Sequence, residues 1–227
     1  MKRSEINTII TESIAFFRRH RFFLPPFAWI KPDEWKAMAK EYESAIGAGL
    51  GWDVTDFGLG RFSETGLLLF TLRNGVPKAQ NDQAKTYCEK IIHLREGQEC
   101  PSHYHTSKME DIINRGGGEL LFRLYWAGAD GRSYSDLEIS IEGDGRTVTC
   151  EAGGVIRLGP GESLTIPPFL YHSFWAEGED VLAGEVSRVN DDVTDNFFYT
   201  DLPRFSDIQE DEPPEYLLVH ELSKFLS

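Results

Sequence analysis

The chain has 227 residues, of which 41% are hydrophobic, and it carries 37 acidic against 23 basic residues. This length and apolar content predict one folded domain with elaborations and exclude a disordered chain. The formal charge of -14 argues against a nucleic-acid partner or an anionic lipid surface, and no apolar run reaches membrane-spanning length. The odd number of cysteines, three, forms no disulfide framework, which predicts a reducing, cytoplasmic location.

Helical periodicity dominates the first sixty residues. Apolar residues recur at helical spacing from Ile6 to Phe17, after Ser4, which we expect to be the N-cap. A second helix is expected after Pro32 and Asp33, ending at Gly47. Residues 1–60 are therefore predicted to form a helical extension packed on the rest of the chain.

Short apolar runs separated by turn residues follow, over residues 61–200. The stretch Asn114–Gly118 is expected to be one of these turns. Residues 201–227 are expected to form a C-terminal segment that packs back on the body, ending in a short helix or strand over Tyr216–Leu226. Seven or more strands predict a mainly β fold, either a sandwich or a barrel. The expected strands are Leu67–Leu72, Tyr87–Arg95, Glu119–Trp126, Leu137–Ile141, Val155–Leu158, Ser163–Ile166 and Val181–Val189.

Three of the six histidines stand in a pattern that suits a metal site. His103 and His105 are two residues apart, so both imidazoles face the same side of a strand. Glu110 follows five residues later, where a turn would bring it within reach of the same point as the two imidazoles, and His172 follows a later apolar segment. Three imidazoles and one carboxylate suit a divalent metal such as manganese, iron, cobalt, nickel or zinc. For a bare His-x-His pair, solvated strand histidines or a hydrogen-bonded pair would be the better explanation, so the interpretation as a metal site depends on the flanking residues.

Two spaced motifs flank these histidines. They resemble the paired motifs of the cupin superfamily, whose small β-barrel or jelly roll holds one metal through two histidines, a glutamate and a later histidine. Phe169 stands where a turn glycine is usual in that pattern, and Ala176 replaces an asparagine, but neither change removes a ligand. The first motif reads Gly97, five residues, His103-Tyr104-His105, four residues, Glu110, six residues, Gly117; the second reads Gly161, five residues, Pro167, four residues, His172.

A closer resemblance lies within the same region. The runs His103–Gly118 and Gly184–Asp192 are similar to the cupin-type D-lyxose isomerase family, and the chain length and the helical N-terminal extension agree with it. This resemblance implies a manganese-dependent aldose-ketose isomerase that converts D-lyxose to D-xylulose, with side activity on D-mannose and D-fructose.

Such a reaction needs a base that moves a proton between C1 and C2 of the sugar. On the strand Val181–Val189, Glu185 lies on the same face as Ser187, but the sequence does not decide whether this face points inward. Burial raises the pKa of such a carboxylate and a nearby cation lowers it. Guided by the family resemblance, we take Glu185 as the proton shuttle; the alternative is a surface glutamate.

Further polar residues are candidates for the same site. Lys90 shares a strand face with apolar neighbours and Lys108 lies between two of the predicted ligands, so either would stabilise charge on a substrate oxygen, unless it is simply solvated. Substrate hydroxyls are matched by Asn190, Asp191 and Asp195, which a solvated acidic loop explains as well.

Two rival functions fit the same residues. An iron-dependent oxygenase uses three histidines and one glutamate, and a non-catalytic carbohydrate-binding barrel needs no base. Exposed strand edges and a helical arm also predict a homodimer.

Overall fold

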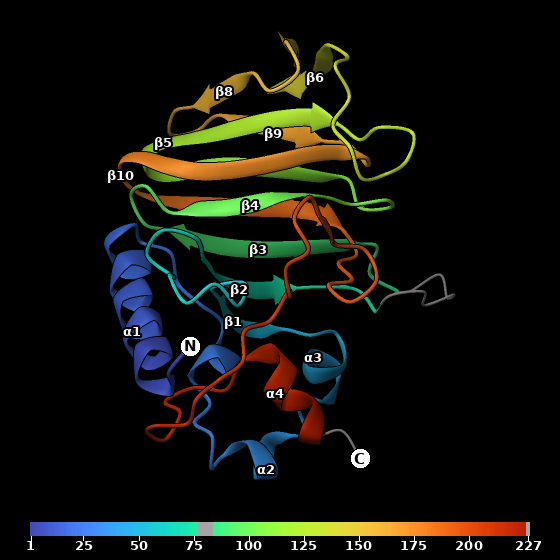
Figure 1. Cartoon of the computed structure of the whole chain (residues 1–227). Helices are drawn as coiled ribbons and strands as arrows, with labels where there is room; N and C mark the ends of the chain where they lie inside the picture. The colour runs from blue at the N-terminus through green and yellow to red at the C-terminus, as the bar shows by residue number, and fades with distance from the viewer. Residues whose placement is uncertain (77–83, 226–227) are drawn as a thin grey trace.

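The computed structural model describes residues 1–76 and 84–225. The mainly β prediction is confirmed: most of the strands form one large sheet that curls around a core (Figure 1). The strands are β1 (Gly51–Thr55), β2 (Leu67–Arg73), β3 (Tyr87–Leu94), β4 (Glu99–Tyr104), β5 (Glu110–Trp126), β6 (Ile139–Gly143), β7 (Arg146–Cys150), β8 (Val155–Leu158), β9 (Ser163–Ile166), β10 (Leu170–Arg188) and β11 (Phe197–Phe198).

Strand β10 organises this sheet. The strand order is β1-β2-β3-β10-β4-β11, while β5 pairs with β10, β8 and β9. The first half of β10 lies between β4 and β5, and its second half lies between β3 and β5. One strand therefore contributes side chains to two parts of the barrel interior. The hairpin β6-β7 forms a separate two-stranded sheet.

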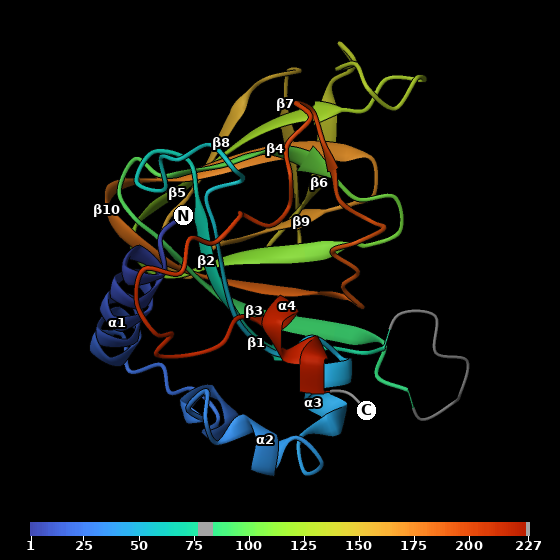
Figure 2. The same ribbon diagram turned by 60° about the horizontal axis from the view of Figure 1, so that its bottom comes forward.

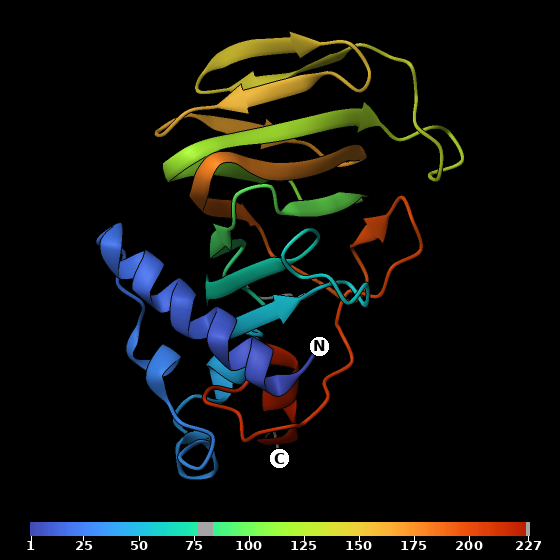
Figure 3. The same ribbon diagram turned by 60° about the vertical axis from the view of Figure 1, so that its left-hand side comes forward.

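The two largest of four buried apolar clusters stabilise the barrel and hold the first helix against it. One fills the barrel, where alternate residues of the strands point inward, and includes Leu124, Leu164 and Phe174. The other lies between the sheet and the first helix, and includes Ile10 and Phe70. Figure 3 shows that helix lying across the strands at the β1-β2 end of the sheet.

The predicted first helix is confirmed as α1 (Arg3–Arg19), but Ser4 is not its N-cap. Lys2 occupies the cap position, and the backbone N–H and hydroxyl of Ser4 both donate to the carboxylate of Asp211. The C-terminal segment thus supplies the acceptor that a capping side chain would otherwise provide.

The predicted second helix is broken into α2 (Trp35–Met38) and α3 (Glu43–Gly47), which Figure 2 shows below the barrel. The helical stretch also ends well before residue 60, because β1 joins the sheet beside β2. Of the helices in the described ranges, none is long and apolar enough to cross a membrane. The remaining helical turns are η1 (Pro26–Trp29), α4 (Val219–Leu222) and η2 (Ser223–Phe225).

The predicted turn at Asn114–Gly118 is wrong, because these residues lie inside β5. Gly117 has φ +98°, and a Cβ there would lie 2.0 Å from the carbonyl oxygen of Asp180 on β10. The glycines therefore form an irregularity in the β5–β10 pairing, where the register shifts between Glu177 and Val181. They mark a close approach of two strands, and the chain does not reverse there.

Candidate metal centre and catalytic pocket

The three predicted histidine ligands come together inside the barrel. His103 on β4 is directly opposite His172 on β10, and His105 follows β4 immediately. All three are buried, and one ligand atom from each lies within 4.8 Å of the others. Glu110 begins β5, and its Oε1 lies 3.0 Å from Nε2 of His172 and 3.7 Å from Nε2 of His105.

Each imidazole is held through its Nδ1. His103 donates to the carbonyl oxygen of Pro101 at 2.8 Å, His172 to that of Leu170 at 3.0 Å, and His105 to that of Asp195. A carbonyl only accepts, so each Nδ1 carries a proton, and in a neutral ring this leaves the lone pair on Nε2.

These histidines fit a metal. Nε2 of His105 and of His172 is buried without a hydrogen-bond partner in the described part of the chain. Burial lowers the pKa of His105 to about 4 and that of His103 well below its usual range, so both rings are neutral. Neutral imidazoles oriented through Nδ1, with unpartnered Nε2 atoms and a carboxylate beside them, are the usual donor set for a divalent metal.

The two predicted lysines and Glu185 form a buried ion cluster beside this centre. Nζ of Lys108 lies 2.6 Å from Oε2 of Glu110 and 3.0 Å from Oε1 of Glu185. Nζ of Lys90 lies 3.1 Å from Oε2 of Glu185, and Ser187 donates to Oε1 of the same carboxylate at 3.0 Å. Glu185 therefore lies on the inward face of β10, which the alternation alone left open.

In this cluster the neighbouring charges shift the pKa values more strongly than burial does. Burial raises the pKa of Glu185, but Lys108 and Lys90 lower it by more, so the net shift is downward. Burial likewise raises the pKa of Glu110, while Lys108 and His105 lower it well below its usual range. The pKa of Lys108 is raised despite its burial, because two carboxylates face it. Both glutamates are thus held as carboxylates at neutral pH.

The structure separates the three predicted substrate-binding residues. The carboxylate of Asp195 accepts hydrogen bonds from residues 106–108, so it anchors the loop between the predicted ligands. Asn190 accepts from Nζ of Lys90 at 2.8 Å and donates to Asp192, so it positions the ion cluster. Asp191 caps its own turn through Val193 and Thr194, outside the residues that line the cavity.

Sequence reasoning missed one buried charge in the cavity wall. Arg204, from the C-terminal segment, lies 2.5 Å from Oδ2 of Asp53 on β1 and 3.2 Å from Oδ1 of Asp192. It lines the same cavity as Lys90 and Glu185, and its Nη1 is buried without a partner among the residues described. An acidic residue in the apolar stretch of β1 was the one available signal, because nothing near Arg204 in the sequence points to it.

Comparison with known proteins agrees with this geometry. A family model described as D-lyxose isomerase matches residues 1–222. The chain belongs to the D-lyxose isomerase family. It is 47% identical to a D-lyxose/D-mannose isomerase of Serratia proteamaculans, over the full length of both chains. It is equally similar to one of Escherichia coli O157:H7, covering 99% of this chain and all of that protein. The protein is therefore a sugar isomerase.

Solved structures of more distant proteins share the fold of this sugar isomerase. An L-ribose isomerase of Acinetobacter sp. DL28 has a TM-score of 0.61 at 14% identity, and one of Cellulomonas parahominis has 0.57 at 15% identity. Each match covers 92% of this chain and 98% of the other. The cupin-type barrel expected from the two motifs is confirmed.

Proposed function

We propose that this sugar isomerase converts D-lyxose to D-xylulose and, as a side activity, D-mannose to D-fructose. The names of its full-length relatives support these substrates. The observation that carries the proposal is the set of converging Nε2 atoms beside Glu110, which suits a divalent metal, with Mn²⁺ as our first choice and Fe²⁺, Co²⁺, Ni²⁺ or Zn²⁺ as alternatives. The ligands would be His103, His105, Glu110 and His172, and the metal would polarise two neighbouring substrate oxygens.

Glu185 is the proposed proton shuttle. As a carboxylate it accepts the proton from C2 of the aldose and returns it to C1, while the hydroxyl proton of O2 passes to O1, so the ketose has the same formula as the aldose. Lys90 and Lys108 keep Glu185 ionised and fix both of its oxygens. The unpartnered Nη1 of Arg204, which lines the same cavity, is available to donate to a sugar hydroxyl.

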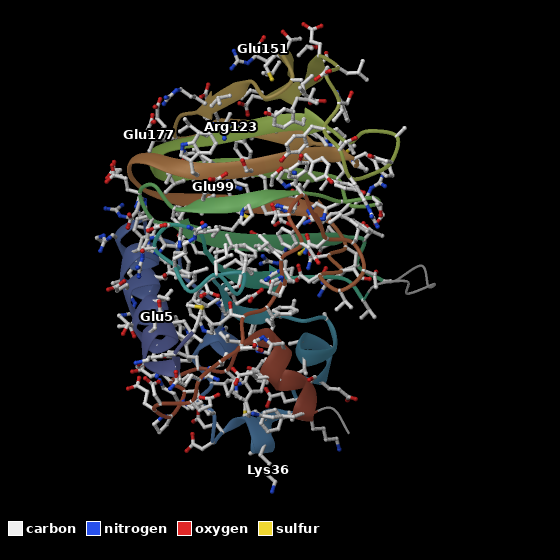
Figure 4. The ribbon with its side chains drawn as sticks, in the orientation of Figure 1. Glu5, Lys36, Glu99, Arg123, Glu151 and Glu177 are labelled. Atoms are coloured by element: carbon white, nitrogen blue, oxygen red, sulfur yellow. The ribbon has the colours of Figure 1, made fainter. Side chains whose placement is uncertain are left out.

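Replacement of the shuttle tests the proposal. Glu185→Gln should lower turnover of D-lyxose by about 10²- to 10⁴-fold, the typical contribution of a positioned base, while metal analysis shows unchanged Mn²⁺ content. The matched control is Glu177→Gln on the same strand, because Glu177 is exposed and pairs with Arg157 at the surface (Figure 4). Unchanged turnover in Glu185→Gln would refute the role of this residue.

Two further measurements distinguish proton transfer from a hydride shift, and an isomerase from an oxygenase. Isomerisation in deuterium oxide should place solvent deuterium on C1 of the product, because the proton on a carboxylate exchanges; complete retention of the original hydrogen would indicate a hydride shift. Turnover should continue without oxygen, whereas strict dependence on dioxygen would indicate an oxygenase. A carbohydrate-binding barrel without catalysis would bind the sugar and leave it unchanged.

The cytoplasmic location and the homodimer stay predictions. The cysteines Cys88, Cys100 and Cys150 are free thiols in the structure, which suits a reducing compartment.

A further inference from the structure

The catalytic cavity leaves little free space. Its volume is about 40 Å³, room for only about three water molecules. A bound sugar would therefore contact the wall closely, so the size of the lining side chains decides which sugar fits. Part of this wall is the metal centre and the ion cluster described above. The rest is mostly apolar and includes Phe57, Leu67, Phe174 and Phe198.

The two substrates proposed above differ at one end only. D-Mannose has the same configuration as D-lyxose at C2, C3 and C4, and it carries one additional hydroxymethyl group on C5. With either sugar, the reacting carbons C1 and C2 would lie at the metal centre and Glu185. Discrimination between the pentose and the hexose therefore depends on the part of the wall that meets the far end of the sugar.

A row of aromatic rings leads away from the metal centre. The ring centroid of Phe198 on β11 lies 5.5 Å from that of His103, and the ring centroid of Phe57 lies 5.4 Å from that of Phe198. Phe57 comes two residues after the end of β1, and its side chain is 1% exposed. A sugar held at the metal centre through C1 and C2 would extend its far end along this row toward Phe57.

The backbone of Phe57 is strained. Its φ is +53°, in the left-handed region that bulky residues rarely adopt. Four non-glycine residues have a positive φ within residues 1–76 and 84–225, and Phe57 is the only buried one among them. Strain of this kind persists only where the surroundings impose it, and it is concentrated at functional sites. The strain therefore singles out this ring among the apolar side chains of the cavity wall.

Hydrogen bonds hold the strained loop in place. The N–H of Phe57 donates to the hydroxyl of Thr55 at 2.9 Å, and the N–H of Asp56 donates to the hydroxyl of Ser206 at 2.9 Å. The carboxylate of Asp56 accepts from the N–H groups of two glycines in the same loop. The ring is thus fixed in the wall and does not withdraw freely from a larger ligand.

We propose that Phe57 determines the chain length of the substrate, because its ring meets the far end of the sugar, accommodates the pentose and limits the hexose. This inference rests on the proposed isomerisation of both sugars at one site. One carbon-sized group more or less in an apolar pocket typically changes kcat/KM by about 10- to 200-fold. One ring at this position is therefore enough to make turnover of the hexose a side activity.

Phe57→Leu tests this role. Leucine has three side-chain carbons fewer than phenylalanine, which provides room for a hydroxymethyl group. In the Mn²⁺-loaded protein, the ratio of kcat/KM for D-mannose to kcat/KM for D-lyxose should rise about tenfold. Phe57→Met is a second variant in case leucine leaves the protein unfolded, because the flexible methionine side chain fills irregular space in a core. It should shift the ratio in the same direction.

Phe122→Leu is the matched control. Phe122 on β5 belongs to the same apolar cluster and is fully buried, but it lies outside the described residues that line the cavity. Thermal unfolding should show a loss of stability in this variant as in Phe57→Leu, whereas its preference between the two sugars should equal that of the wild type. An unchanged ratio in both Phe57 variants, or an equal shift in Phe122→Leu, would overturn the proposal.

The same assay distinguishes failure of this inference from failure of the proposed function. A wild-type protein that isomerises neither sugar would refute the proposed function itself. A wild-type protein that isomerises both sugars, with Phe57 variants of unchanged preference, would refute only the role of Phe57.

Discussion

At the scale of single residues, Asp195 shows how the predicted centre is held. Its two carboxylate oxygens accept hydrogen bonds from the backbone N–H groups of Thr106, Ser107 and Lys108, and its own carbonyl accepts from Nδ1 of His105. One residue thus orients a predicted ligand and fixes the loop that leads to Glu110.

Loss of this anchor should weaken metal binding. Asp195→Ala should lower Mn²⁺ affinity about 10- to 100-fold, as expected when a group supporting a ligand is removed. Asp191→Ala is the matched control, because Asp191 caps its own exposed turn and should leave the affinity unchanged. Titration of the metal-free protein followed by calorimetry measures both; equal effects of the two substitutions would contradict the anchoring role.

The burial of Arg204 leads to a second prediction at the scale of single residues. Arg204→Met leaves the buried carboxylate of Asp53 and the partly buried carboxylate of Asp192 without their cation, and should lower the free energy of unfolding by about 3–5 kcal/mol. Arg157→Met removes a half-exposed bridge to Glu119 and Glu177 and should cost less than about 1 kcal/mol. Urea unfolding compares the two; similar losses would mean that Arg204 is not the buried partner of these carboxylates.

At the scale of elements, the pairing of β5 and β10 decides where the functional side chains lie. Glycines permit the register shift near the middle of the pair, so that both halves of β10 face the interior, with His172 in one and Glu185 in the other. On β5, Gly117 closely approaches the backbone of β10, whereas Gly178 on β10 has open space beside it, and this difference can be measured.

Alanine at these two glycines should have unequal costs. Both have a positive φ, +98° at Gly117 and +88° at Gly178, so each substitution introduces backbone strain of about 1 kcal/mol or more. At Gly117 the new Cβ also meets the carbonyl of Asp180, whereas at Gly178 nothing lies within 4 Å, so Gly117→Ala should cost at least about 2 kcal/mol more. Thermal unfolding measures the loss of stability in both variants. Equal losses would show that β5 and β10 move apart to accommodate the new Cβ at residue 117.

At the scale of the whole molecule, α1 is fixed to the barrel through a buried histidine. Nδ1 of His93 on β3 lies 2.8 Å from the hydroxyl of Ser13 on α1, and its ring stacks on Phe16 at 4.0 Å. Burial lowers the pKa of His93, and this effect exceeds the opposing influence of Asp180. The ring is therefore neutral when the helix is docked.

This neutral histidine makes stability sensitive to acid. The unfolded chain takes up a proton near the usual histidine pKa of about 6.5, whereas the folded chain does so only at lower pH, so acid favours unfolding from about pH 6.5 downward. His93→Gln cannot take up this proton and should show a smaller loss of stability between pH 7 and about 5. Urea unfolding with saturating metal measures the difference; identical pH profiles would contradict it.

Much of the fold was readable from the sequence, because it follows from local patterns. The apolar runs predicted β2, β3, β8 and β9, and the helical spacing predicted α1. The sequence did not predict the short strands β1, β7 and β11, and residues 32–47 form two short helices in place of the one expected. For β1, β11 and the two short helices, contacts with distant parts of the chain override a weak local signal, whereas β7 pairs with its neighbour β6 in a hairpin.

The sequence alone indicated that His103 and His105 share a strand face, because side chains alternate along a strand, and that His172 belongs with them, because the two motifs resemble a known pattern; the structure brings these three histidines together. Tertiary structure decided which face is the interior and which distant residues complete the cavity. Asp195 reaches Thr106 across 89 positions, and Arg204 reaches Asp53 across 151. Contacts over such separations depend on how the strands pair and curl, and no periodicity within one segment encodes them.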